Sequence, residues 1–231
     1  MKKFELTSET KINIFGKKLF RIKALVSFGV VKTGETGGWV EKEENVNQSG
    51  SAWVFDNAEV FDNARVFGNA WVFDNARVFG NARVSGNAEV FDNARMFDNA
   101  RVSGNARVFD NAWVSGNAEV FDNARMSGNA EVFGNAWVFD NARVFGNARV
   151  SGNAEVSGNA DYATIHGFGT QFRTTTFFRC KDKQVKVSCG CFYGTIPEFR
   201  EQVKNTRKGK IAEEYLMIAD LMEKHFAEEA K

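Results

Sequence analysis

Proline, cysteine and histidine are scarce in this sequence of 231 residues, which holds one, three and two of them. Two histidines exclude a zinc site with three histidine ligands. Three cysteines, an odd number, do not make the disulfide framework of a small secreted domain, so we expect a reducing cytoplasm. The sequence also lacks an apolar run of about 18 residues, and no apolar segment follows its basic start, so we expect neither a transmembrane helix nor a signal peptide.

A large excess of charge of either sign is also missing. Thirty basic residues oppose 29 acidic ones, for a net charge of +1. This balance argues against an acidic DNA mimic and against a nucleic-acid binder held by bulk positive charge. Hydrophobic residues make up 43% of the chain, which is enough to bury a core.

One hexapeptide, A-x-V-y-z-N, fills nearly half of the sequence. It runs from Ala52 to Asn159 without insertion or deletion, so that the span of 108 residues holds 18 copies. Met replaces Val at positions 96 and 126; x is Arg, Glu or Trp, y is Phe or Ser, and z is Asp or Gly. Self-similarity at a fixed period is typical of solenoid architectures.

The alternation in A-x-V-y predicts a strand of four residues, with Ala and Val facing inward and x and y facing outward. The z-N pair predicts a corner, because Asp, Gly and Asn tolerate left-handed backbone angles. If the chain bends by about a third of a turn at each corner, each strand pairs in parallel with the strand 18 residues further on. The expected product is a triangular solenoid of about six coils, whose narrow core needs capped ends.

The strings V-F-D-N-A-R and V-S-G-N-A-E resemble the hexapeptide repeat of left-handed parallel β-helices. This resemblance implies a mainly β fold and a left-handed winding. It leaves the function open, because the same fold hosts acyltransferases, carbonic anhydrases and non-catalytic proteins.

The two ends of the chain do not repeat. Residues 1–51 are predicted to form an N-terminal β-hairpin and a capping coil before the repeat domain of residues 52–166. Gly37-Gly38 predicts a tight turn, with a phosphate cradle as the weaker alternative. Residues 167–231 are predicted to form a small α+β module, ββαα, from two strands (170–180 and 184–189), a helix that Pro197 opens, and a helix over 211–227. The strings GGWVEKEEN and CGCF resemble segments of a bacteriophage and prophage family of mostly undefined function.

Residues 18 apart are predicted to form columns on the outer surface. One column stacks four phenylalanines beside two tryptophans, which predicts a binding interface; the alternative is simple ladder packing that binds nothing. A second column stacks arginines that fit an anionic partner, with a solvated mixed-charge face as the alternative. The candidate binding residues are Trp53, Phe55, Trp71, Phe73, Phe91, Phe109, Arg65, Arg83 and Arg101.

These features favour a non-catalytic interaction scaffold that binds its partner through the stacked aromatic and arginine faces and the C-terminal module, forms a dimer or trimer and works without a cofactor. If the phage resemblance holds, the partner is a host protein or a small signalling ligand, and the role is anti-defence. The alternative is an acyl-CoA-dependent acyltransferase with His166 as the general base. A zinc site from Cys180, Cys189, Cys191 and a histidine is disfavoured, because a C-x-C pair on a strand points to opposite faces.

Overall fold

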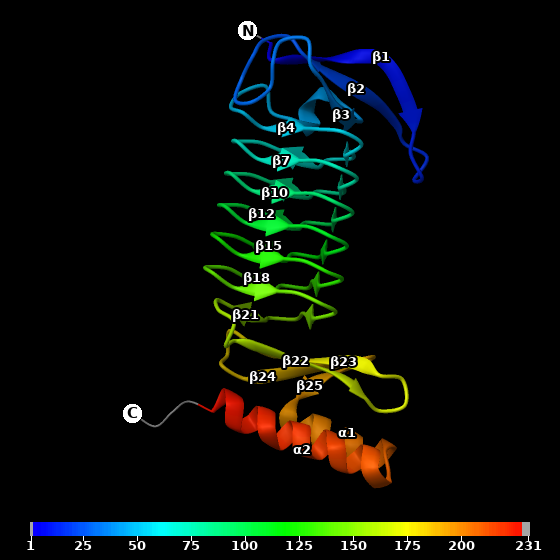
Figure 1. The fold of residues 1–231 in the computed structure, drawn as a ribbon, viewed down its shortest axis with the longest axis vertical. Coiled ribbons are helices and arrows are strands. Elements are labelled where there is room, and N and C mark those ends of the chain that lie inside the picture. The colour runs from blue at the N-terminus through cyan, green and yellow to red at the C-terminus, as the bar shows by residue number, and fades with distance from the viewer. Residues whose placement is uncertain (1, 228–231) are drawn as a thin grey trace.

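The computed structural model describes residues 2–227 as one rod, with a β-solenoid in the middle and a cap at each end (Figure 1). Three parallel sheets form the sides of the solenoid, and each strand pairs with the strand 18 residues further on, as Trp53 does with Trp71. The β-solenoid has about seven turns, which confirms the predicted architecture and adds one turn to the six regular coils.

The strands of the solenoid are two residues long, except for the five-residue β3, and are grouped here by the sheet that each one joins. The β4 sheet holds β4 (Trp53–Val54), β7 (Trp71–Val72), β10 (Glu89–Val90), β13 (Arg107–Val108), β16 (Arg125–Met126) and β19 (Arg143–Val144). The β5 sheet holds β3 (Thr36–Val40), β5 (Glu59–Val60), β8 (Arg77–Val78), β11 (Arg95–Met96), β14 (Trp113–Val114), β17 (Glu131–Val132) and β20 (Arg149–Val150). The β6 sheet holds β6 (Arg65–Val66), β9 (Arg83–Val84), β12 (Arg101–Val102), β15 (Glu119–Val120), β18 (Trp137–Val138) and β21 (Glu155–Val156).

The core of the solenoid is made by the first and third residues of each hexapeptide. The alanines from Ala52 to Ala154 and the Val or Met residues from Val54 to Val156 are all 0% exposed. The strands are shorter than the predicted four residues because the corner takes the other four. The amide of Ala58, for example, donates to the carbonyl of Phe55 at 3.1 Å and closes a turn over y-z-N-A.

The corners explain the choice between Asp and Gly at position z. That residue has a positive φ in 17 of the 18 hexapeptides, at 53–57° for Asp and 65–74° for Gly. An aspartate there also holds the next coil, as the Asp110 carboxylate accepts from the amide of Gly128 at 2.8 Å. The neighbouring asparagines form amide ladders along the corners, such as Asn69 to Asn87 to Asn105 at 3.1 and 3.0 Å. The sequence therefore specifies the left-handed backbone angle at 17 of the 18 corners.

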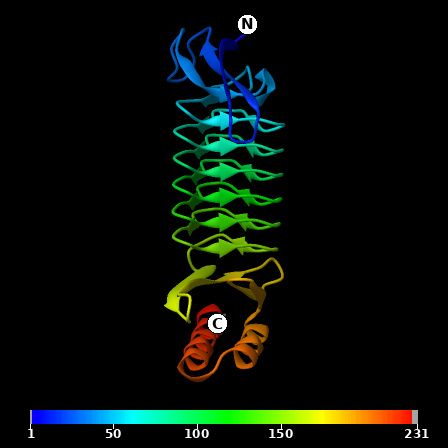
Figure 2. The same cartoon turned by 90° about the vertical axis from the view of Figure 1, so that its right-hand side faces the viewer.

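The N-terminal cap extends one wall of the solenoid. Strands β1 (Phe4–Ile12) and β2 (Lys18–Ala24) form the predicted hairpin, and β3 joins them antiparallel to β2 and parallel to β5. The short 3-10 helix η1 (Glu43–Asn45) completes the extra turn, where buried Asn45 donates to the carbonyl of Ala64 at 2.9 Å. Figure 2 shows the hairpin reaching down the outside of the first coils.

Gly37 and Gly38 lie inside strand β3 and are buried, so the expectation of a tight turn is wrong. A Cβ atom at Gly37 would come within 2.5 Å of the Val54 carbonyl oxygen, and one at Gly38 within 2.6 Å of a Val54 methyl. The glycines are there because the cap backbone packs directly on the first regular coil.

Gly38→Val should therefore destabilise the cap by about 1–3 kcal/mol, because the added side chain overpacks a buried contact with two carbonyl groups. Gly34→Val is the control for the loss of a glycine. No atom lies within 4 Å of a Cβ at Gly34, so valine causes no overpacking there, although the φ of +87° adds local strain. Urea unfolding followed by circular dichroism measures both variants. Equal midpoints for Gly38→Val and wild type would contradict the packing explanation.

The C-terminal module closes the other end with a sheet and two helices. The sheet has four antiparallel strands in chain order, β22 (Tyr162–Phe168), β23 (Arg173–Arg179), β24 (Val185–Cys189) and β25 (Phe192–Thr195). The helices are α1 (Ile196–Thr206) and α2 (Gly209–Phe226). The predicted ββαα arrangement is therefore corrected to ββββαα, and residues 162–166, assigned to the repeat domain, belong to this sheet.

The four-stranded sheet lies between the last coil and the helices (Figure 1). Phe178 and Cys180 pack on the solenoid core. The adjacent residue Phe177 points to the other face of the sheet, where it packs with Val187 and with Phe199 of α1. One alternating strand thus serves two cores, which makes the module a lid on the solenoid. No helix within residues 2–227 is long and apolar enough to cross a bilayer.

Candidate functional site

The predicted aromatic column exists on the β4 sheet, but it is shorter than expected. Phe73, Phe91 and Phe109 stack with nearly parallel rings, at centroid distances of 4.6 and 5.0 Å. Phe55 does not continue this stack; its ring meets Trp71 edge-on at 5.8 Å and packs against the core. The rings of the stack are half-buried, and the guanidinium of Arg107 covers Phe91 at 5.1 Å. We call Phe73, Phe91 and Phe109 the phenylalanine stack.

Trp53 is not on the outer surface. It is 0% exposed, and Phe4 and Phe28 of the N-terminal cap lie edge-on to its ring at 5.7 and 5.3 Å. The prediction that Trp53 faces a partner therefore places it wrongly, because the hexapeptide alone does not show which coil the cap covers.

A second phenylalanine ladder, absent from the candidate binding residues, runs along the β5 sheet. Phe61, Phe79 and Phe97 stack at 5.0 and 5.3 Å, and Phe15 from the hairpin tip packs on the first two. Phe61 is buried as a result. On this face the ladder packs against the N-terminal cap.

The predicted arginine column lies on the β6 sheet. Arg65, Arg83 and Arg101 occupy equivalent positions in β6, β9 and β12, and all three side chains are exposed. Arg101 lies 3.5 Å from Glu119 in the next coil, whereas Arg65 and Arg83 form no ion pair within residues 2–227. The corners that follow these arginines carry Gly68, Gly86 and Gly104 instead of aspartate. We call these three arginines the arginine column.

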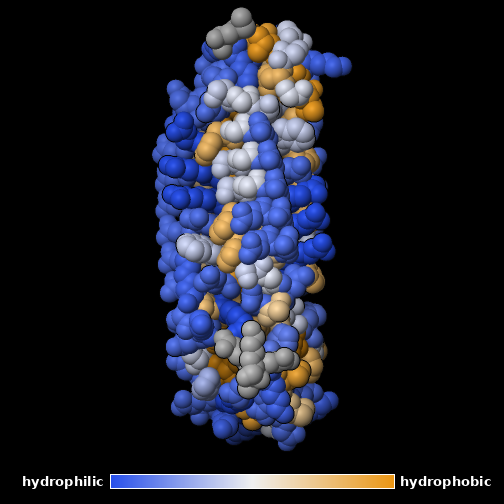
Figure 3. All heavy atoms as spheres, turned by 90° about the vertical axis from the view of Figure 1, so that its left-hand side faces the viewer, coloured by the Kyte–Doolittle hydropathy of each residue, from blue (hydrophilic) through white to orange (hydrophobic). Residues whose placement is uncertain are grey.

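Among the described residues, the side of the rod in Figure 3 has no broad apolar surface. Residues of intermediate hydropathy run along its length between hydrophilic ones, and hydrophobic groups are scattered among them. Exposed apolar area on this side is therefore scattered and does not form one large patch.

The residues considered for an acyltransferase and for a metal site lie apart in the described part of the chain. His166 is exposed on β22, where its Nδ1 lies 3.3 Å from the Thr174 hydroxyl. It lines neither the cavity between the sheet and the helices nor the one beside Pro197 and Phe226. Within the described part of the chain, no three His, Cys, Asp or Glu side chains form a metal-binding group.

All three cysteines are free thiols in different surroundings. Cys180 is buried on the solenoid side of the sheet, and burial raises its pKa to about 11. Cys189 is half-buried on the helix side and accepts a hydrogen bond from the Thr175 hydroxyl at 3.1 Å, while Cys191 is exposed.

The C-terminal module also holds a cavity of about 450 Å³ that the sequence did not indicate. Arg173, Arg207 and Tyr215 are among its walls. They come from β23, the end of α1 and α2, so no local motif joins them.

Comparison with known families agrees with the solenoid. The family described as the YdcK beta solenoid repeat matches residues 70–86, 76–90, 100–116, 136–152 and 142–158. These segments all lie within the hexapeptide array and span well under half of the chain, so they support a repeat β-solenoid and say nothing of its ends. A search of curated proteins finds no match.

Proposed function

We propose that the protein is a non-catalytic interaction scaffold whose arginine column binds an acidic surface of a partner protein. The observation that carries this proposal is the register of Arg65, Arg83 and Arg101, exposed side by side with a single carboxylate partner among them. Adjacent strands in a sheet lie about 4.8 Å apart, so the positive charges add up along the column. An acidic partner gains from this field both in affinity and in association rate.

The rigid backbone beneath the column supports the same proposal. The asparagine ladder from Asn69 to Asn123 follows the corners next to it, and each coil is tied to the next by backbone hydrogen bonds. A surface that is already ordered loses little backbone entropy on binding.

Self-association as a dimer or trimer is the second part of the proposal. The phenylalanine stack and the 58% exposed Phe145 lie on the β4 sheet, away from the arginine column. Aromatic side chains are enriched at the buried centres of protein interfaces. Multi-angle light scattering should report a mass above that of one 25.8 kDa chain, and Phe145→Ser should reduce it.

The resemblance of GGWVEKEEN and CGCF to phage segments supports the finer part of the proposal. In this view the protein is encoded by a bacteriophage or prophage, winds with the left hand that its repeat implies, acts in the host cytoplasm and binds a host protein.

The arginine column is tested by charge reversal. Arg83→Glu should weaken capture of the partner from host lysate about tenfold, and the loss should shrink at high salt, because exposed charges act through screened electrostatics. Arg125→Glu is the matched control, since Arg125 is exposed at the same repeat position on the β4 sheet. Equal capture by wild type and by both variants contradicts the proposal.

A further inference from the structure

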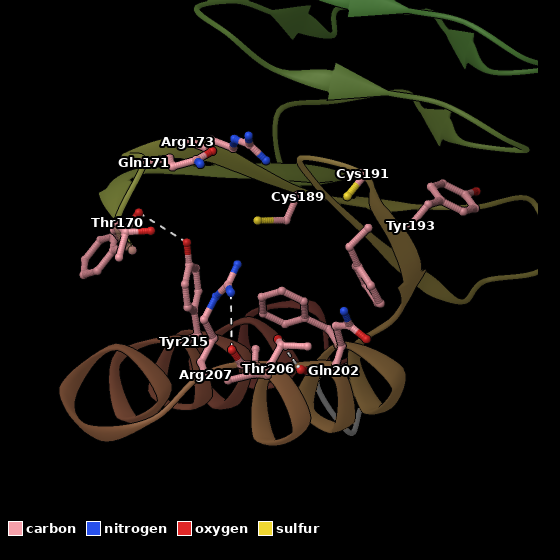
Figure 4. Close-up of a pocket in the computed structure, with 15 residues that line it drawn as sticks. Thr170, Gln171, Arg173, Cys189, Cys191, Tyr193, Gln202, Thr206, Arg207 and Tyr215 are labelled. Atoms are coloured by element: carbon pink, nitrogen blue, oxygen red, sulfur yellow. Dashed lines mark hydrogen bonds between the residues drawn. The ribbon is translucent and has the colours of Figure 1, made fainter.

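The cavity of the C-terminal module lies between the sheet and the helices, on the side away from the solenoid (Figure 4). Its walls come from the turn between β22 and β23, the turn between β24 and β25, the end of α1 and the first half of α2. The volume of about 450 Å³ falls within the range of small-molecule sites.

Two arginines approach this cavity from opposite sides. Figure 4 shows Arg173 on the sheet side and Arg207 on the helix side beside Tyr215, with Cys189 between the two arginines. No Asp or Glu lines the cavity, and neither arginine forms an ion pair within residues 2–227. Burial raises the pKa of Tyr215, and the positive charges of Arg207 and Arg173 oppose that rise.

Backbone features position both arginines. A Cβ atom on Gly190, whose φ is +62°, would come within 2.5 Å of Nη1 of Arg173, so the glycine leaves room for the guanidinium over the β24–β25 turn. Arg207 follows the last residue of α1, where its backbone amide donates to the carbonyl of Val203 at 2.8 Å. Its Nη1 donates to the carbonyl of Thr206 at 3.3 Å, which leaves further donors of the guanidinium free.

Aromatic rings form the rest of the wall. Phe199 is only 3% exposed, and its ring lies 5.4 Å from Phe192 and 5.8 Å from Tyr215. The Tyr215 hydroxyl donates to the carbonyl of Phe168 at 3.2 Å, which fixes its ring at the edge of the cavity. Neutral hydrogen-bonding side chains, Gln171 and Gln202 among them, complete the lining. The cavity thus has two guanidinium groups and several aromatic rings in its lining.

We propose that this cavity binds a small organic phosphate that carries a planar ring, of the nucleotide class, with the phosphate between Arg173 and Arg207 and the ring against the half-buried Phe192. Guanidinium groups bind phosphate with two parallel hydrogen bonds, and aromatic side chains stack on planar rings. The site is independent of the arginine column, so either one can fail without the other.

Isothermal titration calorimetry of the full-length protein tests the proposal with four probes: adenosine monophosphate, guanosine monophosphate, adenosine and inorganic phosphate. At least one nucleotide should bind, and it should bind at least tenfold more tightly than adenosine or phosphate alone. The absence of binding by both nucleotides at millimolar concentration overturns the proposal. Phosphate that binds as tightly as the nucleotide overturns the assignment of a ring site.

Two variants and one control locate the bound probe. Arg173→Gln and Arg207→Gln should each weaken nucleotide binding about tenfold to a hundredfold, the range expected for lost hydrogen bonds to a charged group. Lys204→Gln removes the same charge from an exposed residue of α1 that does not line the cavity, and it should leave the affinity within about twofold. Equal losses in all three variants would show a non-specific charge effect and overturn the site.

A measurement on wild-type protein keeps the proposal testable if a variant fails to fold. Amide chemical shifts in a ¹H–¹⁵N spectrum, recorded with the tightest of the four probes, should change around residues 168–173, 189–193, 202–207 and 215. Changes confined to the arginine column, or to the solenoid, would overturn the assignment to this cavity.

Discussion

Val102→Asp should abolish cooperative folding of the solenoid. Val102 is 0% exposed on β12, in the middle of a core built only from Ala, Val and Met side chains within the coils. Burying an unpaired carboxylate costs several kcal/mol, and loss of the valine removes about 1.5–3 kcal/mol more. Together these losses approach the whole stability of an ordinary domain, about 5–15 kcal/mol. Thermal denaturation followed by circular dichroism should show no sharp transition.

Gly146→Asp is the control, because it introduces the same side chain at a corner of the same array. Gly146 has a φ of +68°, and aspartates adopt 53–57° at equivalent corners. Nothing lies within 4 Å of a Cβ atom there, so the new carboxylate has room to face solvent. We expect the melting temperature of this variant to lie within a few degrees of wild type. If Val102→Asp also melts there, the inward position of the third hexapeptide residue is wrong.

Trp53→Ala should cost about 3–5 kcal/mol, as large-to-small changes in a core do. The side chain is 0% exposed between Phe4 and Phe28. Its indole nitrogen is buried without a hydrogen-bond partner, so the stabilisation comes from apolar contact. Trp53→Phe should therefore retain much of the stability that the alanine variant loses.

Trp113→Ala tests whether that cost comes from the cap or from the repeat position. Trp113 occupies the same place in its hexapeptide but is 39% exposed and lies beside Arg95 and Phe97. We expect a loss near 1 kcal/mol, about the central value for a point substitution. Urea unfolding followed by far-ultraviolet circular dichroism measures both variants, because tryptophan fluorescence changes with the substitution itself. Equal losses at the two positions would contradict a cap-specific role for Trp53.

The solenoid was predictable because every hexapeptide states the same local rule. Inward Ala and Val, a left-handed corner and the 18-residue pairing all follow from period and composition. The lengths of the strands could not be predicted. A backbone hydrogen bond between residue y and the next Ala closes the turn, and the side-chain pattern does not reveal that bond.

The candidate sites were harder to predict because they depend on contacts between distant segments. Trp53 and Trp113 have similar neighbours in the sequence, yet residues 4–28 cover only the first. Strand β22 begins where the hexapeptide pattern ends, and β25 has only four residues and begins two residues after Gly190. Neither strand therefore has a strong sequence pattern of its own. The cavity draws on all four strands of the sheet and on both helices, and its two arginines are 34 residues apart in the sequence.

Because the corners have nearly the same geometry, the number of hexapeptides sets both the length of the rod and the rotation between its two ends. Removing 18 residues from the array should bring the two caps closer by one strand spacing, about 4.8 Å. It should leave the rotation of one cap relative to the other about the long axis unchanged. Removing six should instead rotate the C-terminal cavity by about a third of a turn about the long axis, relative to the N-terminal hairpin. The number of hexapeptides therefore sets the angle at which one molecule presents its two ends to whatever they bind.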